Sequence, residues 1–222
     1  MTNIILKERI SPYGEVVKSS IKDGERVNRI KKALSPEEKK AKAERTSAYK
    51  KHLRAYETAI SSPTKFTYFG TLTSGLNLER TEAKLILDNA AAYLRKSGAN
   101  FFAVVQPGDS NATANYHVHA LTDRPVDLAK WAEEHRCNGD ALYMQPIRDL
   151  NKAIDYIIRF VGRMPKGINK PYRSNYKKLK SYIKLTDVSK GTVIYSNLPI
   201  EFIKKKEVNR LNVTPGGELY AH

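Results

Sequence analysis

The stretch Tyr116-His-Val-His-Ala-Leu-Thr122 gives the clearest indication of the fold. It is typical of a β-strand, in which side chains two positions apart point to the same face. His117 and His119 are therefore expected to share one face, with Val118 turned into a core. Two imidazoles placed in this way can bind one metal ion, although two histidines without a ligand would give the same short pattern. The stretch is a candidate metal site whose meaning depends on the rest of the chain.

The segments around this strand predict a mixed α+β domain. Strands are expected at residues 66–73, 101–106 and 141–145, and helices at 81–96, 126–135 and 149–163. Gly98 ends the first of these helices, and Trp131 is expected on the packed face of the second. The order β-α-β-β-α-β-α is a split βαβ repeat, which predicts a ferredoxin- or RRM-like antiparallel sheet with the histidines on a central strand.

The regions on either side of this block differ from it in composition. Ser35-Pro-Glu-Glu38 has the residues of a capping box and opens a long polar helix toward Ile60. A basic region with several tyrosines follows Met164, then a possible strand at Thr192–Tyr195 and a tail. We therefore expect a basic N-terminal extension at 1–62, a central domain at 63–165 and a basic C-terminal region at 166–222.

The charge of the chain points to a polyanionic partner. The net charge is +16, and it is concentrated in the flanks: residues 61–163 hold 12 Lys and Arg against 11 Asp and Glu, whereas residues 164–222 hold 12 against 4. Basic flanks of this kind suit nucleic acid, although they also occur as solvated tails. Tyrosines are interspersed among cations between residues 170 and 182, which suits base stacking, although an ordinary amphipathic segment can contain the same residues. The candidate nucleic-acid contacts are Lys152, Arg163, Lys170, Arg173, Lys177 and Lys178.

Several classes of protein are disfavoured by the sequence. Cys137 is the single cysteine, which excludes an internal disulfide and a thiolate zinc cluster. No apolar run is long enough to cross a membrane, and the N-terminus lacks the features of a signal peptide, so we expect a cytoplasmic protein without a membrane partner. No Gly-x-x-x-x-Gly-Lys-Ser/Thr sequence occurs, so no fused helicase is expected.

The helix expected around Tyr156 carries the second candidate group. Lys152, Tyr156, Arg159 and Arg163 recur at helical spacing on one stripe, and Ile154, Ile157, Ile158 and Val161 form the opposite stripe. The helix would bury its isoleucines on the sheet and present one tyrosine among three cations. An ordinary amphipathic helix with a tyrosine at the edge of its polar face would have the same sequence pattern. Together with the histidine pair, however, the tyrosine and the cations are the nucleophile, the metal ligands and the charged groups of one phosphoryl-transfer reaction.

These residues resemble the three motifs of the HUH endonucleases, in order. Phe69-Gly-Thr-Leu-Thr73 is similar to the first motif, His117-Val-His119 to the His-hydrophobic-His motif, and Tyr156-Ile-Ile-Arg159 to the Tyr-x-x-Lys motif. The resemblance is specifically to the rolling-circle replication initiators of small phages and plasmids, and it covers about residues 65–165. It implies a ferredoxin-like nuclease domain and Mg²⁺ or Mn²⁺ as cofactor. The implied reaction is nicking and joining of single-stranded origin DNA through a 5′-phosphotyrosine, with a host helicase and polymerase as partners.

The chain departs from the family pattern at three positions. Gln106 stands where many relatives have a glutamate as third metal ligand, with Asp109 as the competing candidate; imidazole alone would also accept Zn²⁺. Arg159 replaces the usual lysine, so it can clamp a phosphate but cannot donate a proton readily. Phe160 stands where two-tyrosine initiators have a second nucleophile, which predicts single-tyrosine chemistry.

Other functions remain compatible with the same residues. Closing a DNA circle would need a second protomer, a second round at Tyr156, or another tyrosine such as Tyr143, Tyr172 or Tyr176. A single-tyrosine transposase or a relaxase would share the metal pair and the nucleophile. A nucleic-acid-binding module that keeps the fold without the chemistry is the alternative of another class, and Gln106 is the main argument for it.

Overall fold

The computed structural model describes residues 4–23, 34–73, 83–107, 116–135, 142–162, 164, 167–168, 170–202, 211–213 and 219–221. The protein belongs to the α+β class and its sheets are antiparallel, which confirms the expected class. The chain forms two compact units, one of residues Ser35–Lys177 and one of Met1–Leu34 together with Lys178–His222. This division differs from the three consecutive regions expected from the sequence, because the second unit combines residues from both ends of the chain.

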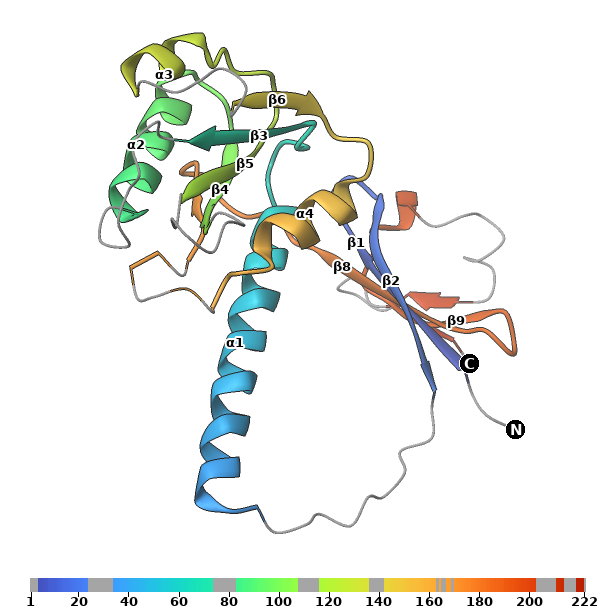
Figure 1. Ribbon diagram of the computed structural model, residues 1–222. Helices are drawn as coiled ribbons and strands as arrows, with labels where there is room; N and C mark the ends of the chain where they lie inside the picture. Colours follow the sequence, from blue (N-terminus) through green and yellow to red (C-terminus); the bar gives the residue numbers. More distant parts are fainter. Residues whose placement is uncertain are drawn as a thin grey trace. The chain divides into compact units, whose positions relative to one another are not determined.

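The unit Ser35–Lys177 contains a five-stranded sheet in the order β6-β3-β5-β4-β7. Along the chain its elements are α1 (Pro36–Ile60), β3 (Tyr68–Thr73), α2 (Ala83–Lys96), β4 (Phe101–Gln106), β5 (His117–Thr122), α3 (Ala129–Glu134), β6 (Tyr143–Pro146), α4 (Leu150–Ile158) and β7 (Tyr172–Arg173) (Figure 1). β5 pairs with β3 on one side and with β4 on the other. The histidine strand is therefore central, as expected.

The two faces of this sheet are covered by different helices. The side chains of Leu72, Val105 and Val118 belong to a buried cluster with α2 and with Trp131 of α3. α2 reaches this cluster because its apolar residues recur at helical spacing, from Ala83 through Leu94. α4 contacts β4 and β5, through Ile154, Ile157 and Ile158, which are fully buried. The histidines lie on the α4 face, because side chains next to each other in a strand point to opposite faces.

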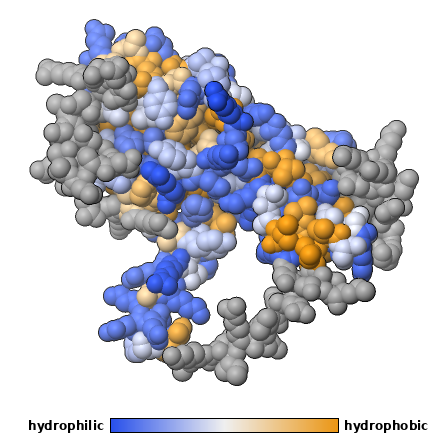
Figure 2. Space-filling view, turned by 45° about the vertical axis from the view of Figure 1, so that its right-hand side comes forward, coloured by the Kyte–Doolittle hydropathy of each residue, from blue (hydrophilic) through white to orange (hydrophobic). Residues whose placement is uncertain are grey.

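Helix α1 is anchored at its C-terminal end. The expected capping box is present, since the Ser35 hydroxyl accepts from the Glu38 amide at 3.1 Å and the Glu38 carboxylate accepts from the Ser35 amide at 2.7 Å. Its first turns are hydrophilic and exposed (Figure 2). Burial begins at Ala55, and the Tyr56 hydroxyl donates to the Asn151 side chain of α4 at 3.0 Å. The end of α1 is thus part of the packing around α4.

The second unit is a six-stranded antiparallel sheet in the order β10-β11-β9-β8-β1-β2. The strands are β1 (Ile4–Ile10), β2 (Val16–Asp23), β8 (Tyr182–Asp187), β9 (Thr192–Ser196), β10 (Leu211–Val213) and β11 (Leu219–Ala221). A 3₁₀ helix lies at Ile200–Phe202. β9 confirms the expected strand near Thr192. β1 pairs with β8, so residues from the two ends of the sequence form one sheet, and the C-terminal residues expected to be a tail contribute its strands β10 and β11.

No helix in the described part of the chain combines the length and the apolar character needed to cross a membrane.

Candidate active site

The two histidines of β5 lie side by side. Their Nε2 atoms are 3.0 Å apart, and their ring centroids are 4.5 Å apart at an interplanar angle of 76°. His119 is buried, at 3% exposure, whereas His117 is half-buried. The predicted sharing of one face by the two rings is therefore confirmed. The two nitrogens are at hydrogen-bond distance from each other, and the same separation of about 3.0 Å is found between neighbouring ligand atoms that lie about 2.1 Å from one octahedral cation.

Thr71 of β3 fixes the orientation of His119. The two residues are directly opposite in the β3–β5 ladder, and the Thr71 hydroxyl is 3.0 Å from His119 Nδ1. When Nδ1 carries the proton and donates to the hydroxyl, the Nε2 lone pair is available to a metal ion. Thr71 lies in the Phe69–Thr73 motif, and cross-strand pairing gives that motif a physical role beside the histidine.

The environment of His119 keeps its ring neutral. Burial, followed by the electrostatic influence of His117 and of Arg159, lowers the pKa of His119 from 6.5 to about 3. A neutral imidazole is the form that binds a metal ion. At neutral pH no proton has to leave His119 before it can act as a ligand.

Gln106 lies opposite His117 in the β4–β5 ladder and is fully buried. Its amide nitrogen donates to the backbone carbonyls of Tyr156 at 3.1 Å and Ile157 at 3.0 Å. Its amide oxygen is buried and has no hydrogen-bond partner among the described residues. A buried polar oxygen without a partner calls for a ligand such as an ion or a water molecule. Gln106 therefore fits both interpretations of the sequence. Its amide nitrogen is bonded to backbone, and its amide oxygen could act as a neutral metal ligand.

Helix α4 brings Tyr156 to the histidines. Its buried isoleucines set the rotation of the helix, and the side chain of Tyr156 on the other stripe is 40% exposed. The ring of Tyr156 meets that of His119 edge-on at 5.1 Å and that of Phe69 at 5.8 Å. The predicted nucleophile and the predicted metal pair, 37 residues apart in sequence from His119 to Tyr156, are thus in contact. The phenol remains accessible to a large substrate.

The predicted cations are placed in different ways. The Arg159 guanidinium lies 4.6 Å from the Tyr156 ring centroid and 4.8 Å from that of Phe160, at the C-terminal end of α4. Lys152 is exposed on the first turn, 3.8 Å from Asp149. Of the predicted cations that the structure describes, Arg159 is thus in contact with the Tyr156 ring.

Among the predicted C-terminal cations, Arg173 is held by its neighbours in the chain. Arg173 donates to the carbonyls of Ser174 and Tyr176 and stacks on the Tyr176 ring, which fixes the chain after β7. Lys170, Lys177 and Lys178 are exposed. Arg163 lies outside the described residues.

The residues present fit a divalent metal ion with nitrogen and oxygen ligands. No group of three or more His, Cys, Asp and Glu side chains that could hold a metal occurs in the described ranges. Asp109 lies outside those ranges. The donor set that can be named is therefore His117, His119 and the amide oxygen of Gln106, which leaves room for solvent or phosphate oxygens.

The structure gives Phe69 and Tyr143 a place in the site as neighbouring aromatic rings, a role that the sequence did not predict. Phe69 contacts His119, Tyr143 and Tyr156, with ring centroids between 5.1 and 5.9 Å apart. The sequence offers Tyr143, Tyr172 and Tyr176 as candidates for a second nucleophile. Tyr172 packs on the α2 side of the sheet and Tyr176 is beside Thr58, whereas Tyr143 is 42% exposed next to Phe69. Side chains in a strand alternate between its two faces, so Tyr143 and Gln145 share one face of β6. This alternation is the feature of the sequence that could have indicated their place in the site.

Comparison of the chain with protein-family models, with curated proteins and with solved structures gave no match.

Proposed function

We propose that this chain is a metal-dependent endonuclease of the HUH type, which nicks and rejoins single-stranded DNA through a covalent bond to Tyr156. Its biological task would be the initiation of rolling-circle replication at an origin, with a host helicase and polymerase as partners. The observation that carries the proposal is the contact of the Tyr156 ring with His119, whose Nε2 atom is 3.0 Å from that of His117.

The arrangement of the sheet supports the same proposal. The strands β6-β3-β5-β4 have the neighbour order of a ferredoxin-like split βαβ repeat, all pairs being antiparallel. The candidate ligands lie on the neighbouring strands β4 and β5, which α4 contacts. The net charge of +16 supports a nucleic-acid substrate.

In the proposed reaction the Tyr156 oxygen attacks the phosphorus of a phosphodiester. A new O–P bond forms, the bond from phosphorus to the 3′ oxygen breaks, the phenol proton goes to solvent, and the released 3′ oxygen takes up a proton. The products are a 5′-phosphotyrosine and a free 3′ hydroxyl. Arg159 can pair with the non-bridging oxygens of the phosphate, since its guanidinium already lies at the Tyr156 ring.

His117, His119 and the amide oxygen of Gln106 would hold Mg²⁺ or Mn²⁺. When bound, the ion polarises the phosphate and stabilises the charge that develops during attack. Thr71 keeps the His119 ring in the required orientation, and the Gln106 amide nitrogen holds the backbone of α4 over the sheet.

The test is incubation of the full chain with circular single-stranded DNA and Mn²⁺, followed by denaturing electrophoresis. The proposal predicts a covalent protein–DNA band that disappears with chelator, in Tyr156→Phe, and in a double alanine variant of His117 and His119. Tyr176→Phe is the matched control and should retain the band. An adduct that survives Tyr156→Phe would contradict the assignment of the nucleophile.

One observation favours the alternative of a binding module without catalysis. The amide nitrogen of Gln106 is fully engaged with backbone carbonyls, as a purely structural residue would be. That alternative predicts salt-sensitive DNA binding and no adduct with any divalent metal. A transposase or a relaxase would give the same adduct, and its preference for origin, transposon-end or transfer-origin DNA would distinguish it.

A further inference from the structure

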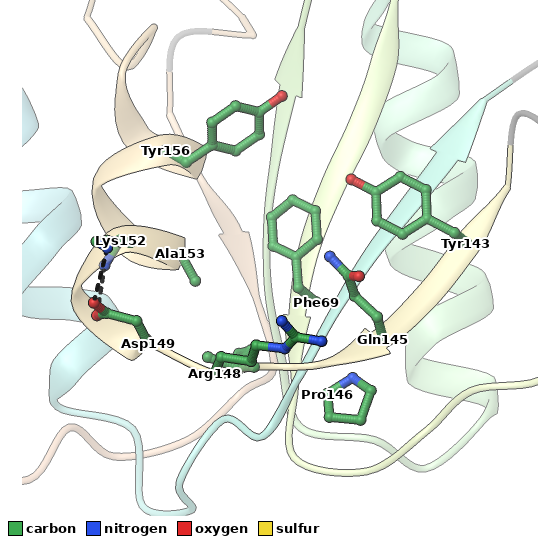
Figure 3. Close-up of a pocket in the computed structure, with 10 residues that line it drawn as sticks. Phe69, Tyr143, Gln145, Pro146, Arg148, Asp149, Lys152, Ala153 and Tyr156 are labelled. Carbon is green, nitrogen blue, oxygen red and sulfur yellow. Dashed lines mark hydrogen bonds and ion pairs between the residues drawn. The ribbon is translucent and has the colours of Figure 1, made fainter.

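A pocket of about 510 Å³ opens beside the candidate active site, between β6 and the first turns of α4 (Figure 3). Its lining includes the rings of Phe69, Tyr143 and Tyr156 and the polar side chains of Gln145, Arg148 and Lys152. The volume falls within the range of about 300–1,000 Å³ that is typical of small-ligand sites. The pocket is therefore large enough for one nucleotide.

The rings give this pocket an exposed stacking surface. Phe69 is buried at 7% exposure, and Tyr143 stacks on it with centroids 5.9 Å apart at 29°. Tyr143 itself is 42% exposed, which leaves part of its ring accessible. In Figure 3 the rings of Tyr143 and Tyr156 lie on opposite sides of Phe69 and come from different elements. An accessible aromatic ring beside cations is the usual platform for an unpaired base.

The polar lining suits the rest of a nucleotide. Arg148 and Lys152 supply two cations, and Figure 3 shows the Arg148 side chain extending toward Gln145. The one acid in the lining, Asp149, accepts from the Lys152 amide at 3.1 Å through one carboxylate oxygen and lies 3.8 Å from the Lys152 ammonium through the other, so the lining carries one net positive charge. Gln145 lies opposite Phe69 in the β3–β6 ladder, and its exposed amide offers both a donor and an acceptor for a base edge. The pocket can thus meet a base and a phosphate together.

The pocket is continuous with the site at the histidines. Tyr143 is opposite Thr71 in one ladder, and Thr71 is opposite His119 in the next, so the three residues form one row on the same face. Tyr156 lines the pocket and also contacts His119. A nucleotide in the pocket would be adjacent in the strand to the phosphate that Tyr156 attacks.

We propose that this pocket binds one nucleotide of the single-stranded DNA, its base stacked on Tyr143 and its phosphate held by Arg148 and Lys152. The inference rests on the proposed function for the identity of the strand. It adds a determinant of affinity and base preference that the three motifs do not contain.

The test measures binding of a fluorescein-labelled single-stranded oligonucleotide to the full chain by anisotropy, in chelator and at several salt concentrations. Tyr143→Ala should weaken binding about tenfold with an unchanged salt slope, because a stacking ring is lost. Tyr143→Phe should bind like the parent. Arg148→Ala should reduce the slope of log K against log salt by about 0.7, because one phosphate contact is lost.

Tyr13→Ala is the matched control, since Tyr13 is 37% exposed and belongs to the other compact unit. It should leave binding unchanged, and the thermal midpoint of every variant should stay at the parental value. Equal weakening by Tyr13→Ala and Tyr143→Ala, or parental binding by Tyr143→Ala, would overturn the pocket assignment.

Failure of the pocket and failure of the proposed function give different results. If the Tyr156 adduct forms and Tyr143→Ala binds normally, the pocket assignment is wrong and the function stands. If no adduct forms but the Tyr143 and Arg148 variants bind as predicted, the pocket stands as part of a binding protein without catalysis.

Discussion

Cross-strand pairs determine the chemistry available to individual residues in the site. His119 faces Thr71 on one side and Val104 on the other, whereas His117 faces Gln106. One imidazole is thus oriented by a hydroxyl, and the other is beside a buried amide oxygen without a partner in the described residues. The two histidines are consequently not equivalent, and substitutions around them should have different effects.

Thr71→Val should lower the affinity for Mn²⁺ by about 10- to 100-fold, because the Nδ1 proton of His119 loses its acceptor. Valine has nearly the same shape, so the fold should be retained. Calorimetric titration of Mn²⁺ measures the change. Thr67→Val is the control, since it removes a hydroxyl bond to the Asp123 carbonyl away from the histidines. Equal loss of affinity in both variants would show that Thr71 has no special role.

The stability of the metal-free protein should fall as the pH is lowered from 6.5 toward 3. The pKa of His119 is about 3 in the folded protein and 6.5 in the unfolded chain, so in this range the unfolded chain takes up a proton that the folded protein does not. Between pH 7 and pH 5 this contributes a loss of about 2 kcal/mol in the free energy of unfolding.

Urea unfolding at a series of pH values measures this dependence. His119→Asn should remove the contribution of His119 and flatten the profile between pH 6.5 and 5, whereas His52→Asn on α1 should leave it as in the parent. A parental profile in His119→Asn would mean that His119 is not kept neutral by the fold.

At the scale of elements, the local pattern of the sequence was a good guide to the central block, to the long helix after Ser35 and to β9, but not to the N-terminal strands or to the last dozen residues. The strand at Phe101–Gln106 and the burial of Trp131 followed from apolar patterning and turn residues, because these signals are local. The pairing of β1 with β8 could not be predicted, because it joins segments more than 170 residues apart and depends on tertiary contacts.

The same limit applies to the site. The histidine pair and the buried stripe of α4 could be predicted, since periods of 2 and 3.6 fix which side chains share a face. The contact of Phe69 with Tyr156 and the position of Tyr143 depend on strand register. Strand register cannot be predicted from the local sequence pattern. The expected end of the last helix at residue 163 was wrong, because α4 ends at Ile158 and the chain turns at Gly162.

Gly162→Ala should destabilise the unit Ser35–Lys177 by about 1–3 kcal/mol. Gly162 has a φ of +86°, and an added Cβ would lie 3.2 Å from the Ala48 carbonyl oxygen of α1. Thermal unfolding followed by circular dichroism measures the loss. Gly98→Ala is the control for backbone strain alone, since its φ is +74° and nothing lies within 4 Å of the added atom. A smaller loss in Gly162→Ala than in Gly98→Ala would contradict close packing of α1 at this turn.

At the scale of the whole molecule, charge is shared between the two compact units. The unit Ser35–Lys177 carries 23 Lys and Arg against 15 Asp and Glu, and the remaining residues carry 16 against 8. Each therefore has a net charge of +8, although the second is much shorter. The candidate active site lies wholly in the unit Ser35–Lys177, and the remaining residues carry more net charge per residue.

The central claim is that Tyr156 forms a covalent bond to the 5′ phosphate of cleaved DNA. The most direct measurement is mass spectrometry of the peptides obtained by protease and nuclease digestion after incubation with Mn²⁺ and single-stranded DNA. The account predicts a nucleotide phosphate on the peptide that contains Tyr156, absent in the metal-free sample. A nucleotide phosphate on another residue, or an unmodified Tyr156 in DNA that has been cleaved, would contradict it.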